Sequence, residues 1–429
     1  MNNFEKLKEL VADCTAPTAP RMYRALYGMR DDEPAIQLGG WDEWRALPMM
    51  NKNTLVETPF ADRFFASHSD IEDIRTSSGT SGKKPPFIPR VFPRGLEYRL
   101  QYHSFKNPIL AFKVPYMMHW HEELQQSLGY APRVVAFDPV HAEASIRLAR
   151  IAGVDAIITF AFHIPLIGTL MSREGMTENI RLIEINGENC TRSLFDFMRT
   201  TFPNAVILPQ FGAAEVEDKP LGVPCRAITG EEPLSVYHAK DTQYHEVIDS
   251  DTLEVLPYQA GSEGELVVTS HVPKPRATPL IRYRTGDIVK ILPEKCAAHN
   301  QLQFTIIGRV SIDFVKIPGG VLRADEMERV LLAIDNDISD RFEIHRYVHN
   351  HEAGPKIGMV VHITSRTGRN LDMEHIARDI SNHFRVGPKR TYAQGVQSGM
   401  YVPLSCALLV NSSHTEKMKR IIVHEPEKS

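Results

Sequence analysis

Short apolar runs alternate with mixed polar and apolar segments through the middle of the chain. The runs are rich in β-branched residues and predict strands, whereas the mixed segments predict helices. The strands are expected at 131–138, 155–160, 179–185 and 205–208, and the helices at 142–151 and 193–201. Strands that alternate with helices indicate a mainly parallel sheet in an α/β domain.

The two flanking regions carry other patterns. The opening segment, residues 1–60, mixes polar and apolar positions as helices do. From Tyr244 the chain becomes β-rich, and from about Phe314 short strands and helices indicate a separate α+β unit. In that unit, helices are expected at 324–333 and 373–384, and strands at 343–349, 357–364 and near 403–410.

These patterns predict an α/β fold with two domains. A large N-terminal α/β domain with a β-rich subdomain would span residues 1–309, and a small, mobile C-terminal α+β domain would span 310–429. The boundary is expected just after Gly308-Arg309, because a glycine at a strand end can serve as a hinge. An ordinary linker followed by a capped helix explains the same residues.

Composition narrows the function classes. The 429 residues fit two or three domains, and 49 basic against 53 acidic residues leave a net charge of −4, which excludes a polybasic nucleic-acid surface. The longest apolar stretch, 156–171, is shorter than the ~20 residues of a membrane-spanning helix. The N-terminus lacks the pattern of a signal peptide, so a cytoplasmic protein is expected. Five scattered cysteines argue against a disulfide framework and leave metal binding or burial open.

Three short motifs could carry chemistry. Ser77–Lys83, read SSGTSGK, places hydroxyls and glycines before a lysine, as a phosphate-binding loop or a flexible linker would. Its spacing is not that of a Walker A loop. Ile281–Asp287 ends in a Gly-Asp pair that could present a carboxylate to ribose hydroxyls or form an ordinary turn after a strand. The third motif is the Gly308-Arg309 pair.

In this order, the three motifs resemble those of the adenylate-forming superfamily, and most of all its phenylacetate–CoA ligase-like branch. The resemblance runs from about Trp41 to the C-terminus. It implies ATP-dependent activation of an aryl or cyclic carboxylic acid as an acyl-adenylate, followed by transfer to CoA. Transfer to an amine, as in amide-forming ligases of natural-product biosynthesis, and transfer to a carrier-protein pantetheine are alternatives. A non-catalytic nucleotide-binding relative is a further alternative.

The resemblance also implies roles for single residues. The ATP phosphates would lie against Ser77, Ser78, Gly79, Thr80, Ser81, Gly82 and Lys83. The adenine would lie against Gly187, Glu188 and Phe211. Gly212 and Ala214, which follow Phe211, would also contact the nucleotide, and Glu215 would hold Mg²⁺. Asp287 would bind the ribose, and Arg309 the ribose or a phosphate. Lys417, with Lys419 as the alternative, would be the lysine that enters the site for adenylation.

Departures from the family pattern bear on the acceptor. Ala214 replaces a threonine, and the segment Ile317–Arg323 differs from the one that relatives use for the CoA half-reaction. The altered segment Pro318–Arg323 keeps the amine alternative, whereas Ala214 favours the non-catalytic nucleotide-binding relative. The expected partners are therefore a carboxylic acid and CoA or an amine, without nucleic acid or membrane. The oligomeric state stays open, with a homodimer as one possibility.

Two further groups of residues are candidates for binding. His119, Phe162, His163 and Gly212 could line the acid pocket, although the segment around His119 fits a core helix as well. Cys225, His238, Cys296 and His299 offer the thiolate and imidazole ligands of a structural zinc site, which some members of this branch carry. The alternative is buried cysteines beside unrelated histidines.

Overall fold

The computed structural model describes most of the chain in two compact units, Met1–Ile306 and Ile307–Ser429. The described residues are 3–65, 70–71, 73–76, 87–90, 99–112, 129–130, 132–216, 220–271, 277–310, 313–349, 356–387, 390–409 and 420–424. Among them, no helix is both long and apolar enough to cross a membrane.

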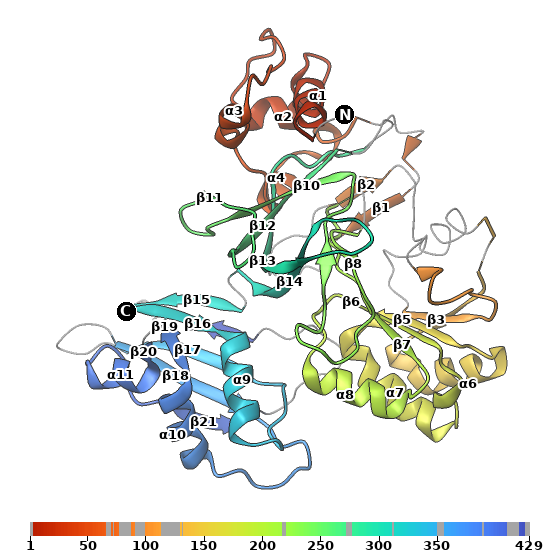
Figure 1. Ribbon diagram of the computed structural model, residues 1–429, viewed down its shortest axis with the longest axis vertical. Helices are drawn as coiled ribbons and strands as arrows, with labels where there is room; N and C mark the ends of the chain where they lie inside the picture. The colour runs from red at the N-terminus through yellow and green to blue at the C-terminus, as the bar shows by residue number, and fades with distance from the viewer. Residues whose placement is uncertain are drawn as a thin grey trace. The chain divides into compact units, whose positions relative to one another are not determined.

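A five-stranded parallel sheet forms one layer of the first unit, as the alternating pattern predicted. Its order is β4-β3-β5-β6-β7. The strands are β3 (Ile109–Phe112), β4 (Val134–Phe137), β5 (Ala156–Phe160), β6 (Leu182–Asn186) and β7 (Val206–Pro209). Figure 1 shows the helices α6 (Ala142–Ala152), α7 (Ile164–Arg173) and α8 (Arg192–Thr201) on one face.

Burial on both faces explains why the central strands β5 and β6 are almost wholly apolar. All five residues of β6 are buried, and so are the first four of β5. Ile157, Ile183 and Ile207 face one apolar cluster, whereas neighbouring residues such as Ile158 and Leu182 face another. The helix α7 and the strand β3 were not predicted, because a run of apolar residues does not separate helix from strand.

A mixed group of helices and a seven-stranded sheet complete the first unit. The helices are α1 (Asn3–Thr15), α2 (Arg21–Leu26), α3 (Trp41–Ala46) and α4 (Lys52–Glu57). The sheet, of order β11-β10-β12-β13-β14-β9-β8, contains β8 (Val223–Pro224), β9 (Tyr237–His238), β10 (Gln243–Ile248), β11 (Val255–Leu256), β12 (Glu263–Ser270), β13 (Tyr283–Lys295) and β14 (Leu302–Arg309). Helix residues such as Leu10 and Trp44 share an apolar cluster with sheet residues such as Leu266. A small antiparallel pair joins β1 (Asp73–Thr76) to β2 (Phe87–Arg90).

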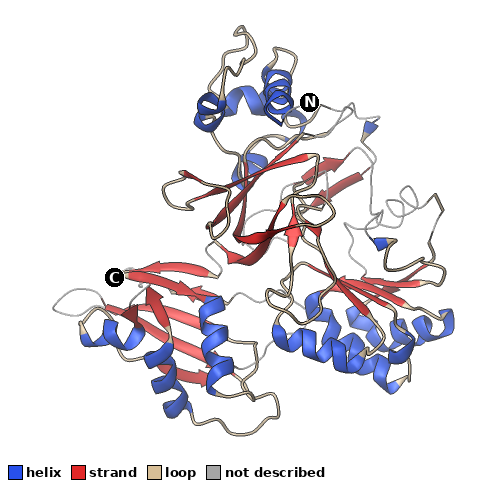
Figure 2. Cartoon of the chain, in the orientation of Figure 1, coloured by secondary structure: helices blue, strands red, loops and turns tan. Residues whose placement is uncertain are grey.

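The second unit is the predicted α+β arrangement. Its four-stranded sheet, β21-β18-β17-β22, consists of β17 (Glu343–His349), β18 (Lys356–Ile363), β21 (Ser405–Leu408) and β22 (Ile421–Val423). Residues of α9 (Ala324–Ile334) and α10 (Met373–His383) share its apolar core, and Figure 2 shows both helices beside the sheet. The remaining elements are β15 (Phe314–Ile317), β16 (Gly320–Arg323), β19 (Arg385–Gly387), β20 (Arg390–Thr391) and α11 (Tyr392–Gln397). The predicted strand 343–349 and both predicted helices are confirmed to within a residue.

Candidate functional site

Several predicted site residues cannot be placed. Ser77–Lys83, His119, Lys417 and Lys419 all lie outside the described residues. The structure does describe the predicted residues in the segments 160–163, 187–188 and 211–215, Asp287, the Gly308-Arg309 pair and the four candidate metal ligands.

Two predicted segments follow neighbouring strands at one edge of the parallel sheet. Gly187 comes directly after β6, and its φ of +81° suits glycine. A Cβ at Gly187 would lie 2.8 Å from the Phe160 ring, so the close contact also requires glycine. Gln210, after β7, donates its backbone N–H to the Ile185 carbonyl at 2.9 Å. Because ligands of open α/β sheets bind at the carboxyl ends of the strands, residues 187–188 and 211–215 lie where a nucleotide would be expected.

Phe211 belongs to the apolar core of this region. Its ring centroid is 5.6 Å from that of Tyr237 and 6.2 Å from that of Phe304. The side chain is only 6% exposed. The ring that the resemblance assigns to adenine therefore has aromatic neighbours within the protein.

Glu215 is a buried carboxylate with a nearby cation. Its side chain is 9% exposed, and its Oε1 lies 3.7 Å from the Nζ of Lys52 at the start of α4. Lys52 was not predicted from the sequence. The neighbouring Asn51 indicates the start of a helix, because its side chain accepts from the backbone N–H groups of Asn53 and Thr54, but it gives no indication of the contact with Glu215.

The strand that carries Asp287 is held by two arginine–glutamate pairs. Arg282 is 1% exposed and pairs with Glu246, and it also donates to the carbonyls of Arg45 and Leu47 at 2.6 and 2.7 Å. Arg284 pairs with Glu265 at 2.6 Å. Buried charges require such partners, so these pairs fix the strand rather than leave its arginines free for a ligand.

The predicted turn at Gly286-Asp287 is wrong, because both residues lie inside β13. Glu265 pairs with Ile288 and Val267 with Arg284, so residues 285–287 bulge opposite Leu266. The Thr285 hydroxyl donates to the Leu266 carbonyl at 2.9 Å, and the φ of Gly286 is +76°. Glu265 also accepts from the Gly286 N–H at 3.1 Å. The bulge thus places Asp287 as a strand residue, 8% exposed, where a turn was expected.

A short segment connects this strand to Glu215. Met50 forms a bridge with Tyr283, and its carbonyl accepts from the Arg284 N–H at 2.9 Å. Lys52, two residues further along the chain, then reaches Glu215. The structure therefore brings the segments of Glu215 and Asp287 to the same stretch of backbone, which sequence spacing alone did not predict.

The aromatic segment after β5 is tightly packed. The rings of Phe160 and Phe162 stack with centroids 5.2 Å apart, and the Nδ1 of His163 lies 3.2 Å from the Thr159 hydroxyl. Burial lowers the pKa of His163 to about 4, so this imidazole is neutral at physiological pH. As an acid-pocket residue, His163 would offer a hydrogen bond rather than a charge.

Gly308 and Arg309 lie in a crowded segment. A Cβ at Gly308 would lie 2.4 Å from the Phe314 ring. The backbone N–H of Arg309 donates to the Asp313 carboxylate at 2.9 Å. Asp313 therefore restrains the backbone of the predicted hinge.

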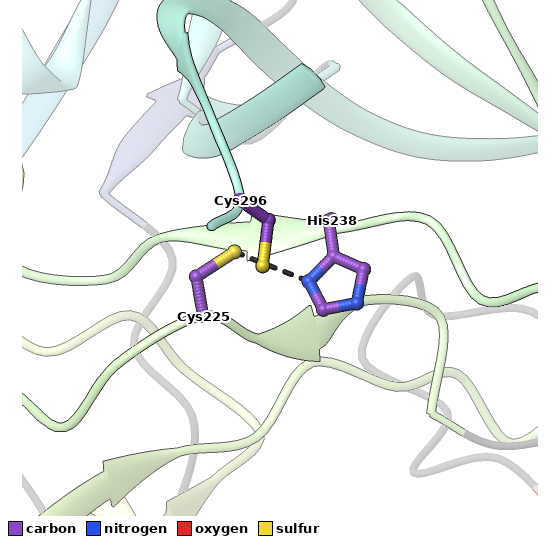
Figure 3. A group of neighbouring side chains, drawn as sticks. All are labelled: Cys225, His238 and Cys296. Atoms are coloured by element: carbon purple, nitrogen blue, oxygen red, sulfur yellow. Dashed lines mark hydrogen bonds between the residues drawn. The ribbon is translucent and has the colours of Figure 1, made fainter. Parts of the chain in front are cut away.

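Three of the four predicted metal ligands converge. Cys225 follows β8, His238 lies in β9 and Cys296 follows β13, and their ligand atoms lie within 4.8 Å of one another. Figure 3 shows the three side chains pointing toward one another, with the Cys225 Sγ 3.2 Å from the His238 Nδ1. Thiolates and an imidazole are the ligands that zinc prefers, so this donor set fits that ion.

The fourth predicted ligand, His299, does not belong to this converging group. Its ring stacks on that of His238, with centroids 4.4 Å apart and 23° between the planes. Its Nδ1 lies 3.5 Å from the Cys296 Sγ. The turn from Cys296 to Asn300 brings the ring to this place, because the Cys296 carbonyl accepts from the His299 N–H. His299 is thus a stacking neighbour.

Burial affects the protonation of the cluster in the absence of a cation. Burial, followed by the neighbouring Cys296, raises the pKa of Cys225 to about 12, and burial lowers the pKa of His238 to about 4. Both groups are therefore neutral at pH 7. Binding of a divalent metal would release the thiol protons.

Comparison with known proteins supports the adenylate-forming resemblance. No protein-family model matches the chain. A phenylacetate–coenzyme A ligase of Pseudomonas putida is 38% identical over 108 residues, which cover 25% of this chain and 23% of that protein. One of Aromatoleum evansii is 40% identical over 92 residues, which cover 21% of this chain and 20% of that protein. The matched stretches thus span less than a quarter of either relative.

The likeness to solved structures extends over nearly the whole chain. A 2-hydroxyisobutyryl-CoA ligase has a TM-score of 0.66 at 17% identity, covering 98% of this chain and 88% of its own. An acyl acid amido synthetase has a TM-score of 0.61 at 13% identity, covering 99% and 92%. These findings confirm the expected α/β fold and the resemblance to the adenylate-forming superfamily and its phenylacetate–CoA ligase-like branch.

Proposed function

We propose that the protein activates a carboxylic acid with ATP and transfers the acyl group to CoA. The observation that supports this most is the arrangement at the carboxyl edge of the parallel sheet, where Gly187, Glu188 and Glu215 follow adjacent strands. The sequence likeness to phenylacetate–coenzyme A ligases agrees with it. An aryl or cyclic acid is the proposed substrate class.

In the first half-reaction, an oxygen of the acid attacks the α-phosphorus of ATP and pyrophosphate leaves. Negative charge on the phosphate oxygens grows, so positioning and cations provide most of the catalysis. Glu215 would hold Mg²⁺, Asp287 would accept hydrogen bonds from the ribose hydroxyls, and Lys417 would supply a positive charge. In the second half-reaction, the thiol of CoA displaces AMP from the acyl carbonyl and forms a thioester.

An acid–amine ligase is the second candidate. The segment that differs from CoA-using relatives forms the hairpin of β15 and β16, whose turn is fixed within its unit. The Tyr401 hydroxyl donates to the Pro318 carbonyl at 2.7 Å, and a Cβ at Gly320 would lie 2.0 Å from the Val386 carbonyl oxygen. A solved amido synthetase shares the fold, so this architecture is compatible with amine acceptors as well.

A panel of carboxylic acids tests the function. The protein is mixed with ATP and Mg²⁺, and pyrophosphate release is followed without acceptor, with CoA, and with a mixture of amino acids. Release with a thioester detected by mass spectrometry supports the acid–CoA ligase. An amide product supports the second candidate. If ATP binds but no acid across the panel causes release, the protein is instead a nucleotide-binding relative without catalysis.

Lys417→Ala tests the proposed catalytic lysine. We expect adenylation to fall by at least about 100-fold, because one cation on the developing phosphate charge is removed, while ATP binding measured by calorimetry changes little. Lys419→Ala is the matched control and should retain activity. The reverse result would assign the role to Lys419.

We also propose a structural zinc ion held by Cys225, His238 and Cys296. The support is the convergence of two thiols and an imidazole from three strands of one sheet. Zinc there would hold the ends of β8 and β13 together. Metal analysis of the purified protein tests this, with about one zinc per chain expected.

A further inference from the structure

The contact between Lys52 and Glu215 has features of a pair that can exchange partners. The 3.7 Å separation of Nζ and Oε1 exceeds the ~2.7–3.2 Å of a hydrogen bond. The ammonium therefore neutralises the carboxylate without being fixed to it. Lys52 is also 25% exposed, whereas Glu215 is 9% exposed, so the lysine lies on the open side of the pair.

The backbone around Lys52 is firmly held. Asn51 and Thr54 form a reciprocal capping box, and Met50 bridges to Tyr283 on the strand of Asp287. Only the flexible four-carbon side chain of Lys52 remains to move. A fixed backbone with a flexible charged side chain allows the ammonium to change its contacts when a ligand binds.

Two cations would compete for one carboxylate. If Glu215 holds Mg²⁺, the ion and the Lys52 ammonium share one carboxylate and repel each other, because Mg²⁺ in nucleotide sites is held by one or two carboxylates and by phosphate oxygens. The displaced ammonium would then lie beside the anionic phosphates that arrive with the metal. A lysine is a common phosphate ligand.

We propose that Lys52 is a further phosphate-binding residue of the ATP site. It neutralises Glu215 before the nucleotide arrives, and it moves to the phosphate oxygens when Mg²⁺ takes the carboxylate. This inference rests on the proposed function. No covalent step is involved, because only non-covalent partners are exchanged.

Calorimetric titration of the full chain with ATP, with Mg²⁺ and with a chelator in its place, tests the proposal without measuring activity. Lys52→Met removes the charge and keeps most of the side-chain length. We expect ATP affinity to fall about 10- to 100-fold, the usual effect of one lost charge-assisted hydrogen bond. The loss should be larger without Mg²⁺, when Lys52 is the cation that offsets Glu215. The dependence of ATP binding on Mg²⁺ therefore increases.

Matched variants separate this from a structural effect. Lys52→Arg keeps the charge and should retain most of the affinity. Lys290→Met removes another paired lysine, 2.9 Å from Glu263, and should change neither titration. Thermal unfolding checks each variant, and Lys52→Gln replaces Lys52→Met if the latter does not fold.

The outcomes distinguish the two proposals. An unchanged affinity in Lys52→Met, or an equal loss with and without Mg²⁺, overturns the role of Lys52, because a structural defect would not depend on the metal. If the wild-type chain does not bind ATP at all, the proposed function itself fails. If the wild type binds ATP and adenylates an acid while Lys52→Met behaves as wild type, only this inference fails.

Discussion

Two groups of histidines, one in each unit, both contain stacked rings but differ in where their ligand atoms lie. In the cysteine–histidine cluster (Cys225, His238, Cys296 and His299), the rings of His238 and His299 stack 4.4 Å apart. In the histidine stack of the second unit (His345, His362 and His424), the rings of His345 and His362 stack 4.1 Å apart. Among the described residues, only Cys225, His238 and Cys296 have ligand atoms that converge.

The difference lies in where the ring nitrogens point. Ligand lone pairs lie in the plane of an imidazole, so rings that meet face to face do not aim their nitrogens at one point. In the histidine stack, both nitrogens of His345 already have neighbours: Nε2 lies 2.9 Å from Glu343, and Nδ1 lies 3.0 Å from the Nε2 of His424. The histidine stack therefore differs from the cysteine–histidine cluster in that the nitrogens of His345 are directed at Glu343 and His424, whereas the His238 nitrogen meets two thiols.

Among the changes that test this difference, removing a thiol should have the largest effect on metal binding and stability. Cys296→Ser is expected to abolish zinc binding and to lower stability by about 4 kcal/mol where free zinc is about 1,000-fold above its dissociation constant. Metal analysis and chemical unfolding, with and without a chelator, measure both effects. Cys406→Ser, in the second unit, is the control and should keep the metal. A wild-type protein that never contains zinc would contradict the prediction.

Lowering the pH should have an intermediate effect on stability, because the histidine stack becomes protonated. Burial, then the neighbouring His345, lowers the pKa values of His362 and His424 below 6.5. The folded state then binds fewer protons than the unfolded state, so this contribution to stability is complete above pH 6.5 and is lost as the pH falls below it.

The measurement is thermal unfolding of the full chain between neutral and mildly acidic pH. His362→Gln should reduce the acid-induced fall in unfolding temperature by a few degrees at most, because the stack is partly exposed. His375→Gln, on the exposed side of α10, is the control and should leave the fall unchanged. An equal fall in wild type and His362→Gln would show that the stack does not bind these protons.

Sequence patterns predicted the layers of the fold better than the details of the site. Four of the five strands of the parallel sheet were predicted, and the central ones stood out because burial on both faces leaves them almost wholly apolar. The bulge at residues 285–287 was missed, because it depends on a hydrogen bond from Thr285 to a neighbouring strand. Lys52 was missed for the same reason, since its partner Glu215 is distant in the sequence.

Among the predicted metal ligands, the position of one side chain, that of His299, also could not be predicted from the sequence. Residue types, together with the family resemblance, suggested Cys225, His238 and Cys296 as candidate ligands, and the structure brings them together. The spacing Cys-x-x-His also predicted His299, but a turn fixes only the backbone. The His299 ring stacks on His238 and places its Nδ1 3.5 Å from the Cys296 Sγ, and this position depends on packing between strands that are far apart in the sequence.

The smallest expected effect on zinc content and stability comes from a substitution that tests whether His299 is a zinc ligand or only a stacking neighbour of His238. His299→Phe keeps an aromatic face for the ring of His238 and removes both nitrogens. As a stacking neighbour, it should leave the zinc content unchanged and change stability by no more than about 1 kcal/mol. His238→Phe, by contrast, should lose the metal, because the imidazole that converges with the thiols is gone. If His299→Phe also lost the metal, then His299 would be a ligand in the metal-bound protein, in agreement with the 3.5 Å between its Nδ1 and the Cys296 Sγ. That outcome would sharpen the contrast between the two groups, because both rings of the His238–His299 pair would then be ligands, whereas no ligand atoms converge in the described histidine stack of the second unit.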